Sequence, residues 1–265
     1  MKGGIKFLMA LSLILAFVPV SFAADLLTEI KEKGEIVVAM EGTWAPWTYH
    51  DGKDEKLVGY DVEVARRIAE KLGVTAAFVE GEWDGLFAGL DAGRYDIVVN
   101  GVEFTEERAE KYDFSVPYGY IHTALIVRAD NDAIKSFEDL RGRTTANSVA
   151  STYMTLAESC GAEARGVDTL DETMLMVLSG RVDATLNANV SFYDYMRVHP
   201  DAPLKEVALT RDASQVCIPM RKGADSETLK RAIDAAIEEL RASGELRALS
   251  EKYFGSDISG TGSGE

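Results

Sequence analysis

Several residue types are scarce in this chain, and each shortage argues against a class of protein. The two cysteines, Cys160 and Cys217, are too few for a disulfide scaffold in 265 residues. The three histidines, His50, His122 and His199, are too far apart for a structural zinc site. Lysine and arginine number 28 against 44 acidic residues, so the formal charge is −16. Such a chain lacks the basic surface that nucleic acid or anionic lipid requires.

Motifs of common catalytic sites are also missing. The sequence has no phosphate-binding or dinucleotide-binding glycine loop, no Gly-x-Ser-x-Gly elbow and no His-Glu-x-x-His helix. Acidic pairs are numerous, but none is distinctive enough to predict a general acid and base. The cysteines suit small buried hydrophobic positions, although an exported chain could also pair them. We therefore expect a binding protein rather than an enzyme, with no cofactor and no metal.

Residues 1–23 are typical of a secretory signal peptide. Lys2 and Lys6 precede an apolar run at 7–20, and small residues follow it at 21–23. The alternative is a membrane anchor, but the run is shorter than the about 20 residues that span a bilayer. No cysteine follows the run to carry a lipid. We expect an exported, diffusible protein of the periplasm.

The remaining chain alternates short apolar strands with amphipathic helical patterns. Strands are predicted at 35–40, 78–79, 96–100, 144–147 and 183–187, and helices at 61–72, 84–92, 152–159, 169–178 and, with a break at 243–244, 226–254. This order predicts an α/β fold with mostly parallel sheets flanked by helices. Segments 90–97 and 178–184 resemble each other, because in both a helix ends at glycine and Arg-x-Asp precedes a strand. Either such joints are simply common, or the chain has two lobes of one topology.

Eight motifs together resemble one family, the periplasmic solute-binding proteins of family 3 type, which deliver polar amino acids to ABC importers. Within it, a branch that handles cystine or other polar amino acids is the nearest likeness. The motifs are EGTWAPW at 41–47, GYDVEVA at 59–65, WDGL at 83–86, GRYD at 93–96, FTEER at 104–108, YDFSVPY at 112–118, SFEDLRG at 136–142 and GRVDA at 180–184. They are weak singly, but their order covers nearly all of the chain after the leader.

The resemblance implies a two-lobed fold with the ligand in the cleft and two crossover strands as the hinge. Lobe 1 would comprise 24–121 and 217–256, and lobe 2 would comprise 122–216. The crossovers would fall near 120–122 and 215–217, and residues 257–265 would be a disordered tail.

The resemblance also implies a set of ligand-binding residues. Arg108 matches the arginine that clamps the ligand α-carboxylate, which suits a guanidinium fork. Trp44 and Trp83 would pack on the ligand side chain, and Glu41 would face its far end. Without the family match, these residues could equally be a surface arginine, core tryptophans and a solvated glutamate. The other positions expected at the site are Gly101, Thr105, Ser148, Ala150, Ser151, Thr152 and Asn187, although Ser151 and Thr152 could simply cap a helix.

One departure from the family pattern concerns the ligand ammonium group. Many members carry an aspartate where this chain has Ala188, so the usual charged partner is missing. Glu103 stands where many members have a small hydroxyl residue. We predict that Glu103 takes over the ammonium contact, because a buried ammonium needs a counter-charge. The alternative is that Glu103 points to solvent.

These residues predict a monomeric solute-binding component that captures a polar amino acid, such as cystine or a basic amino acid, for ABC permease subunits in the membrane. Negative charge around the pocket disfavours glutamate. Two alternatives use the same scaffold. One is a dehydratase-like enzyme with Glu103 as its acid or base, and the other is a sensory module that hands its signal to a receptor.

Overall fold

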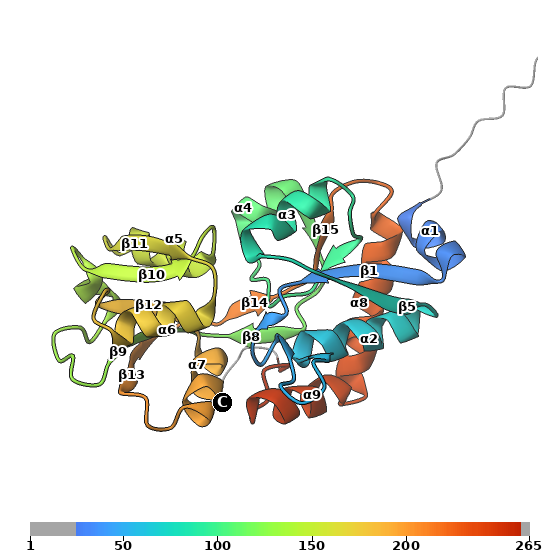
Figure 1. The fold of residues 1–265 in the computed structure, drawn as a ribbon. Helices are drawn as coiled ribbons and strands as arrows, with labels where there is room; N and C mark the ends of the chain where they lie inside the picture. Colours follow the sequence, from blue (N-terminus) through green and yellow to red (C-terminus); the bar gives the residue numbers. More distant parts are fainter. Residues whose placement is uncertain (1–24, 261–265) are drawn as a thin grey trace, which may run out of the picture.

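The computed structural model describes residues 25–260, which form two α/β lobes joined by a two-stranded crossover (Figure 1). The predicted signal peptide, residues 1–23, lies outside the described residues, as does the 261–265 part of the predicted tail. Within the described residues, no helix is long and apolar enough to cross a membrane.

The first lobe is built on a mixed five-stranded sheet of order β5-β1-β6-β15-β7. Its strands are β1 (Glu35–Met40), β5 (Thr75–Glu80), β6 (Ile97–Val98), β7 (Tyr112–Phe114) and β15 (Pro219–Arg221). Its helices are α1 (Leu26–Lys33), α2 (Tyr60–Leu72), α3 (Trp83–Asp91), α4 (Glu106–Lys111), α8 (Glu227–Ala242) and α9 (Glu245–Phe254). The predicted apolar stripe of α2, from Val62 to Leu72, is buried in the core. A small sheet of β2 (Thr43–Trp44), β3 (Thr48–His50) and β4 (Leu57–Val58) precedes α2.

The second lobe is built on a second mixed five-stranded sheet, of order β11-β10-β12-β9-β13. Its strands are β9 (Thr123–Arg128), β10 (Thr144–Ser148), β11 (Glu163–Val167), β12 (Ala184–Ala188) and β13 (Leu204–Leu209). Its helices are α5 (Thr152–Ser159), α6 (Leu170–Leu178) and α7 (Asn189–Val198), with a short 3-10 helix at Phe137–Leu140. The sheet core is apolar, because Leu125, Ala146 and Leu186 are fully buried.

The crossover consists of β8 (Gly119–Ile121) and β14 (Ser214–Val216), which pair antiparallel between the two lobes (Figure 1). Both strands begin one residue before the positions implied by the family resemblance. The exact limits of the lobes stay a prediction, but the α/β fold with two lobes and two crossover strands is confirmed.

The two similar sequence segments occupy equivalent positions in the two lobes. Gly93 and Gly180 both adopt a positive φ, of 66° and 70°. The following aspartates each accept a backbone N–H from the adjacent strand, Asp96 from Val37 and Asp183 from Thr144, both at 2.8 Å. This shared geometry favours two lobes of one topology over a chance likeness.

Two local expectations differ from the structure. The strand predicted at 96–100 is regular only at Ile97–Val98, although Val99 still donates its N–H to Ala39. The tail predicted to be disordered is ordered where it is described. Ile258 is buried and its carbonyl accepts the N–H of Tyr120, so apolar burial holds this segment against the crossover.

Candidate functional site

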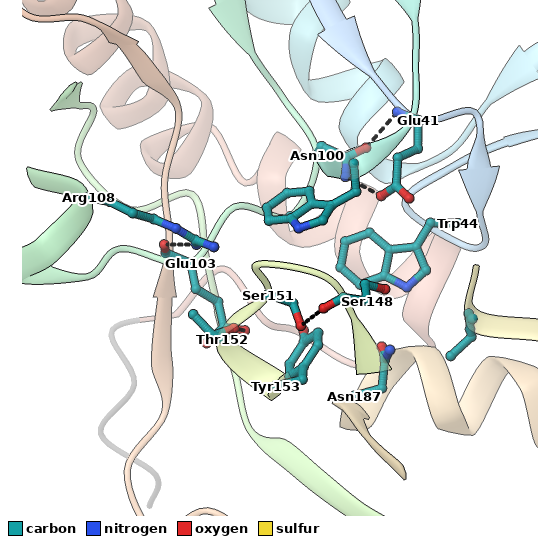
Figure 2. Close-up of a pocket in the computed structure, with 13 residues that line it drawn as sticks. Glu41, Trp44, Asn100, Glu103, Arg108, Ser148, Ser151, Thr152, Tyr153 and Asn187 are labelled. Atoms are coloured by element: carbon teal, nitrogen blue, oxygen red, sulfur yellow. Dashed lines mark hydrogen bonds between the residues drawn. The ribbon is translucent and has the colours of Figure 1, made fainter. Parts of the chain in front are cut away.

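A cavity lies between the two lobes, a place where small-molecule sites commonly occur. Figure 2 shows side chains of both lobes facing one another across it. The lining residues are Glu41, Trp44, Trp83, Asn100, Gly101, Glu103 and Arg108 from the first lobe, and Ser148, Ser151, Thr152, Tyr153, Leu170 and Asn187 from the second.

Arg108 reaches the cavity from the first turn of α4. Thr105 caps this helix by accepting the Arg108 N–H at 3.1 Å. The guanidinium group lies 5.3 Å from the ring centre of Trp83 and donates to the Glu103 carbonyl at 2.9 Å. It also donates to the Ala150 carbonyl of the second lobe at 3.2 Å. Burial lowers the pKa of Arg108, and the charge of Glu103 opposes that effect. A guanidinium group held on aromatic rings at a cleft is well placed to bind a carboxylate.

The Glu103 side chain is 5% exposed, so the alternative in which it points to solvent is wrong. It accepts a hydrogen bond from the Thr152 hydroxyl of the second lobe at 2.8 Å. The Tyr153 side chain, next along α5, lines the same cavity. A carboxylate therefore lies where the two lobes meet. Ala188, at the position of the family aspartate, is fully buried and brings no charge.

The start of α5 forms the second-lobe wall. Ser151 caps the helix by accepting the Met154 N–H at 3.1 Å and donates to the Ser148 carbonyl at 2.6 Å (Figure 2). Ala150 precedes it with a φ of 57°, a conformation that non-glycine residues rarely adopt. This turn directs the Ala150 carbonyl toward Arg108. Ser151 is thus both a helix cap and part of the cavity wall.

Glu41 and Asn100 form a bonded pair at the other end of the cavity. The Glu41 N–H donates to the Asn100 side chain at 2.8 Å, and the Asn100 amide donates to the Glu41 carboxylate at 2.6 Å (Figure 2). Burial raises the pKa of Glu41 to about 7, against the opposing effect of the Asn100 hydrogen bond. A cationic group placed beside Glu41 would relieve this cost of burial.

Aromatic rings form the wall beside Glu41. Trp44 stacks on Trp47 with ring centres 5.3 Å apart, and the Trp47 indole N–H donates to Ser191 of α7 at 2.9 Å. The Trp44 ring lies so close to Gly101 that a Cβ there would come within 2.5 Å of it, so only glycine fits. Trp44 is therefore held in place by the opposite lobe through Trp47.

Asp61 supports this wall from behind. It is fully buried and accepts hydrogen bonds from the Gly101 N–H at 2.5 Å and the Tyr118 hydroxyl at 2.8 Å. Burial raises its pKa to about 7, while these two bonds oppose the shift. Asp61 thus fixes Gly101 and ties the cavity floor to the residue that precedes β8.

The structure places all the predicted site residues at the cavity except Thr105 and Ala150, which instead position Arg108. Sequence reasoning missed Asn100, Tyr153 and Leu170. Asn100 had a usable signal, since it is the polar last residue of the strand predicted at 96–100, and side chains at strand ends reach a cleft. No group of three or more potential metal ligands occurs among residues 25–260. Cys160 and Cys217 are unpaired, and burial raises the pKa of Cys217 to about 12.

The family model for bacterial extracellular solute-binding proteins, family 3, matches residues 36–256. The chain therefore belongs to this family. It is 38% identical over 235 residues to the L-cystine-binding protein TcyA of Bacillus subtilis, covering 89% of this chain and 87% of that protein. Relatives such as TcyA are transport binding proteins rather than enzymes.

Two solved structures show the same fold. The L-cystine solute receptor of Neisseria gonorrhoeae, in an unliganded open conformation, is 42% identical, with a TM-score of 0.61 over 89% of this chain and 99% of the receptor. The substrate-binding protein AbpA of Streptococcus pneumoniae, bound to L-arginine, is 30% identical, with a TM-score of 0.79 over 87% of this chain and 99% of that one. The lower identity thus accompanies the better superposition.

Proposed function

We propose that this chain captures a free α-amino acid that carries a second positively charged nitrogen at its far end. Arg108 binds the α-carboxylate, Glu103 binds the α-ammonium group and Glu41 binds the distal cation. The observation that supports this most is the charge of the cavity wall, which has two carboxyl groups and one guanidinium group. A basic amino acid offers the complementary set, one carboxylate and two cations.

This class includes arginine, lysine, ornithine and cystine, which have a second cationic nitrogen. Similarity to the cystine-binding relatives supports cystine, and similarity to AbpA supports arginine. Cavity charge favours the basic amino acids, because the second carboxylate of cystine has no further cationic side chain to meet among the described lining residues. For the same reason glutamate should bind weakly.

The family is extracellular, and the predicted signal peptide supports export to the periplasm. We expect the chain to act there as a monomer and to present its ligand to ABC permease subunits. Trp47 and Arg108 each donate a hydrogen bond to the opposite lobe, so the two lobes can close on a ligand. Closure of this kind is a hinge motion, and a permease can distinguish the closed form from the open form.

A ligand screen tests the proposal. Residues 24–265 are unfolded, washed and refolded to remove bound ligand, and thermal melts are then recorded with each standard amino acid, ornithine and cystine. A ligand at 100 times its Kd adds about 2.7 kcal/mol to the free energy of unfolding, which raises Tm measurably. We expect the largest rise with a member of the proposed class and none with L-glutamate. The proposal is wrong if no amino acid raises Tm or if glutamate raises it most.

A further inference from the structure

Tyr153 is a part of the cavity wall to which the proposed ligand contacts give no role. It is the second residue of α5, and its side chain is 6% exposed and lines the cavity. Its hydroxyl makes no hydrogen bond of normal geometry within residues 25–260, although it faces the Glu103 carboxylate. A buried hydroxyl without a partner carries a desolvation penalty, so a phenylalanine would be the more stable choice here.

The surroundings of this hydroxyl are charged. Thr152, the neighbouring residue, donates to the Glu103 carboxylate at 2.8 Å, and Arg108 lines the same cavity. Burial raises the pKa of Tyr153 well above its usual value; the negative charge of Glu103 and the hydrogen-bonding position of its carboxylate add to the effect, while Arg108 opposes it. The hydroxyl thus belongs to a cavity wall that also holds a carboxylate and a guanidinium group.

The second lobe offers the cavity no carboxylate of its own. Its lining residues within the described chain are hydroxyl, amide and apolar side chains, and Ala188 is too small to reach a ligand. Of these, Tyr153 has a buried polar atom that is still free to bond. A phenolic hydroxyl can accept a hydrogen bond from an ammonium group while donating its own proton to a carboxylate.

We propose that the Tyr153 hydroxyl contacts the ligand and, together with Glu103, binds the α-ammonium group. This inference rests on the proposed function and deepens it, because it assigns half of the ammonium site to the second lobe. The ligand nitrogen then bridges the lobes, with Glu103 on one side and Tyr153 on the other. Binding at this point favours closure of the cleft.

The test is Y153F, measured by calorimetry with two ligand pairs. The pairs are L-arginine and its α-deamino analogue, and L-cystine and its deamino analogue. We expect Y153F to weaken binding of the amino acid about tenfold and to leave the analogue within about twofold. Without ligand, the Tm of Y153F should equal or exceed that of wild type, because the unpaired hydroxyl is gone. Y195F, on α7 away from the cavity, is the matched control and should change neither affinity.

E103Q provides the second variant. If Glu103 and Tyr153 bind one nitrogen, the loss in the double variant should be smaller than the product of the two single losses. The inference is overturned if Y153F weakens amino acid and analogue equally, or if it weakens neither while wild type binds the amino acid. If wild type binds none of arginine, lysine, ornithine and cystine, the proposed function fails first and the inference falls with it.

Discussion

Acidification should weaken binding of a ligand with a cationic far end, because it protonates Glu41. In the free protein the pKa of Glu41 is raised from 4.5 to about 7, chiefly by burial. A bound cation favours the ionised form and lowers that pKa again. Below about pH 7 the ligand must displace a proton, so Kd rises about tenfold per pH unit. If the bound pKa returns to the ordinary value, the full loss is about 2.5 orders of magnitude, or about 3 kcal/mol.

Calorimetry between pH 5 and pH 8 measures both the affinity and the proton released. We expect about half a proton released at pH 7 and nearly one at pH 6, read from buffers of different ionisation enthalpy. E41Q keeps an acceptor for the Asn100 amide but has no charge, so it should bind more weakly at pH 8 with a flat profile. L-citrulline, a neutral counterpart of L-arginine, should show the same flat profile with wild type.

Asp61 is the group that could imitate this behaviour, since its pKa is also raised to about 7. It lies behind the wall, bonded to Gly101 and Tyr118, and does not line the cavity. A pH slope that persists in E41Q would therefore assign the proton to another group and refute the role of Glu41. A flat profile in wild type with L-arginine would refute it as well.

Three further predictions follow from the contacts of the site. R108K should raise Kd by about 100-fold or more in calorimetry, because an ammonium group cannot replace a bidentate guanidinium fork. S191A leaves the Trp47 indole N–H buried without its acceptor, which destabilises the closed arrangement of the lobes by about 1–3 kcal/mol. Although Ser191 does not line the cavity, titration followed by Trp fluorescence should therefore show a Kd about tenfold higher. Cys217, whose pKa is raised to about 12, should resist alkylation at pH 8 in the native protein, and mass spectrometry should show it labelled only after unfolding.

Much of the fold could be predicted from hydrophobic periodicity. The helix predicted at 152–159 matches α5, and the break at 243–244 separates α8 from α9. The limits of the strands were harder to predict. For example, β6 is regular for only two residues, and its continuation is held by single backbone hydrogen bonds to β1. The end of the described chain was misjudged because its polar, glycine-rich composition conceals Ile258, which packs on the crossover.

Some residues of the candidate site could likewise be predicted from the sequence, and others could not. Charged residues inside recognisable motifs, such as Arg108 and Glu41, could be assigned to the cavity through the family resemblance that those motifs carry. Tyr153 could not, because a tyrosine at helical spacing looks like an ordinary core residue. Its unpaired hydroxyl becomes visible only when α5 is docked against Glu103 of the other lobe. Contacts between lobes depend on the hinge geometry, which local sequence patterns do not encode.

The lobes meet through the same groups that are proposed to hold the ligand. Arg108 donates to the Ala150 carbonyl, and Thr152 donates to Glu103. With its lobes in contact in this way, the chain superposes better on an arginine-bound relative at 30% identity than on an open receptor at 42% identity. A ligand must therefore exchange these bonds rather than simply add new ones, and such exchanges contribute little net free energy. Net affinity then rests on the groups that the lobes do not already satisfy for each other, the carboxylate of Glu41 and the hydroxyl of Tyr153, and selectivity among amino acids rests on Glu41.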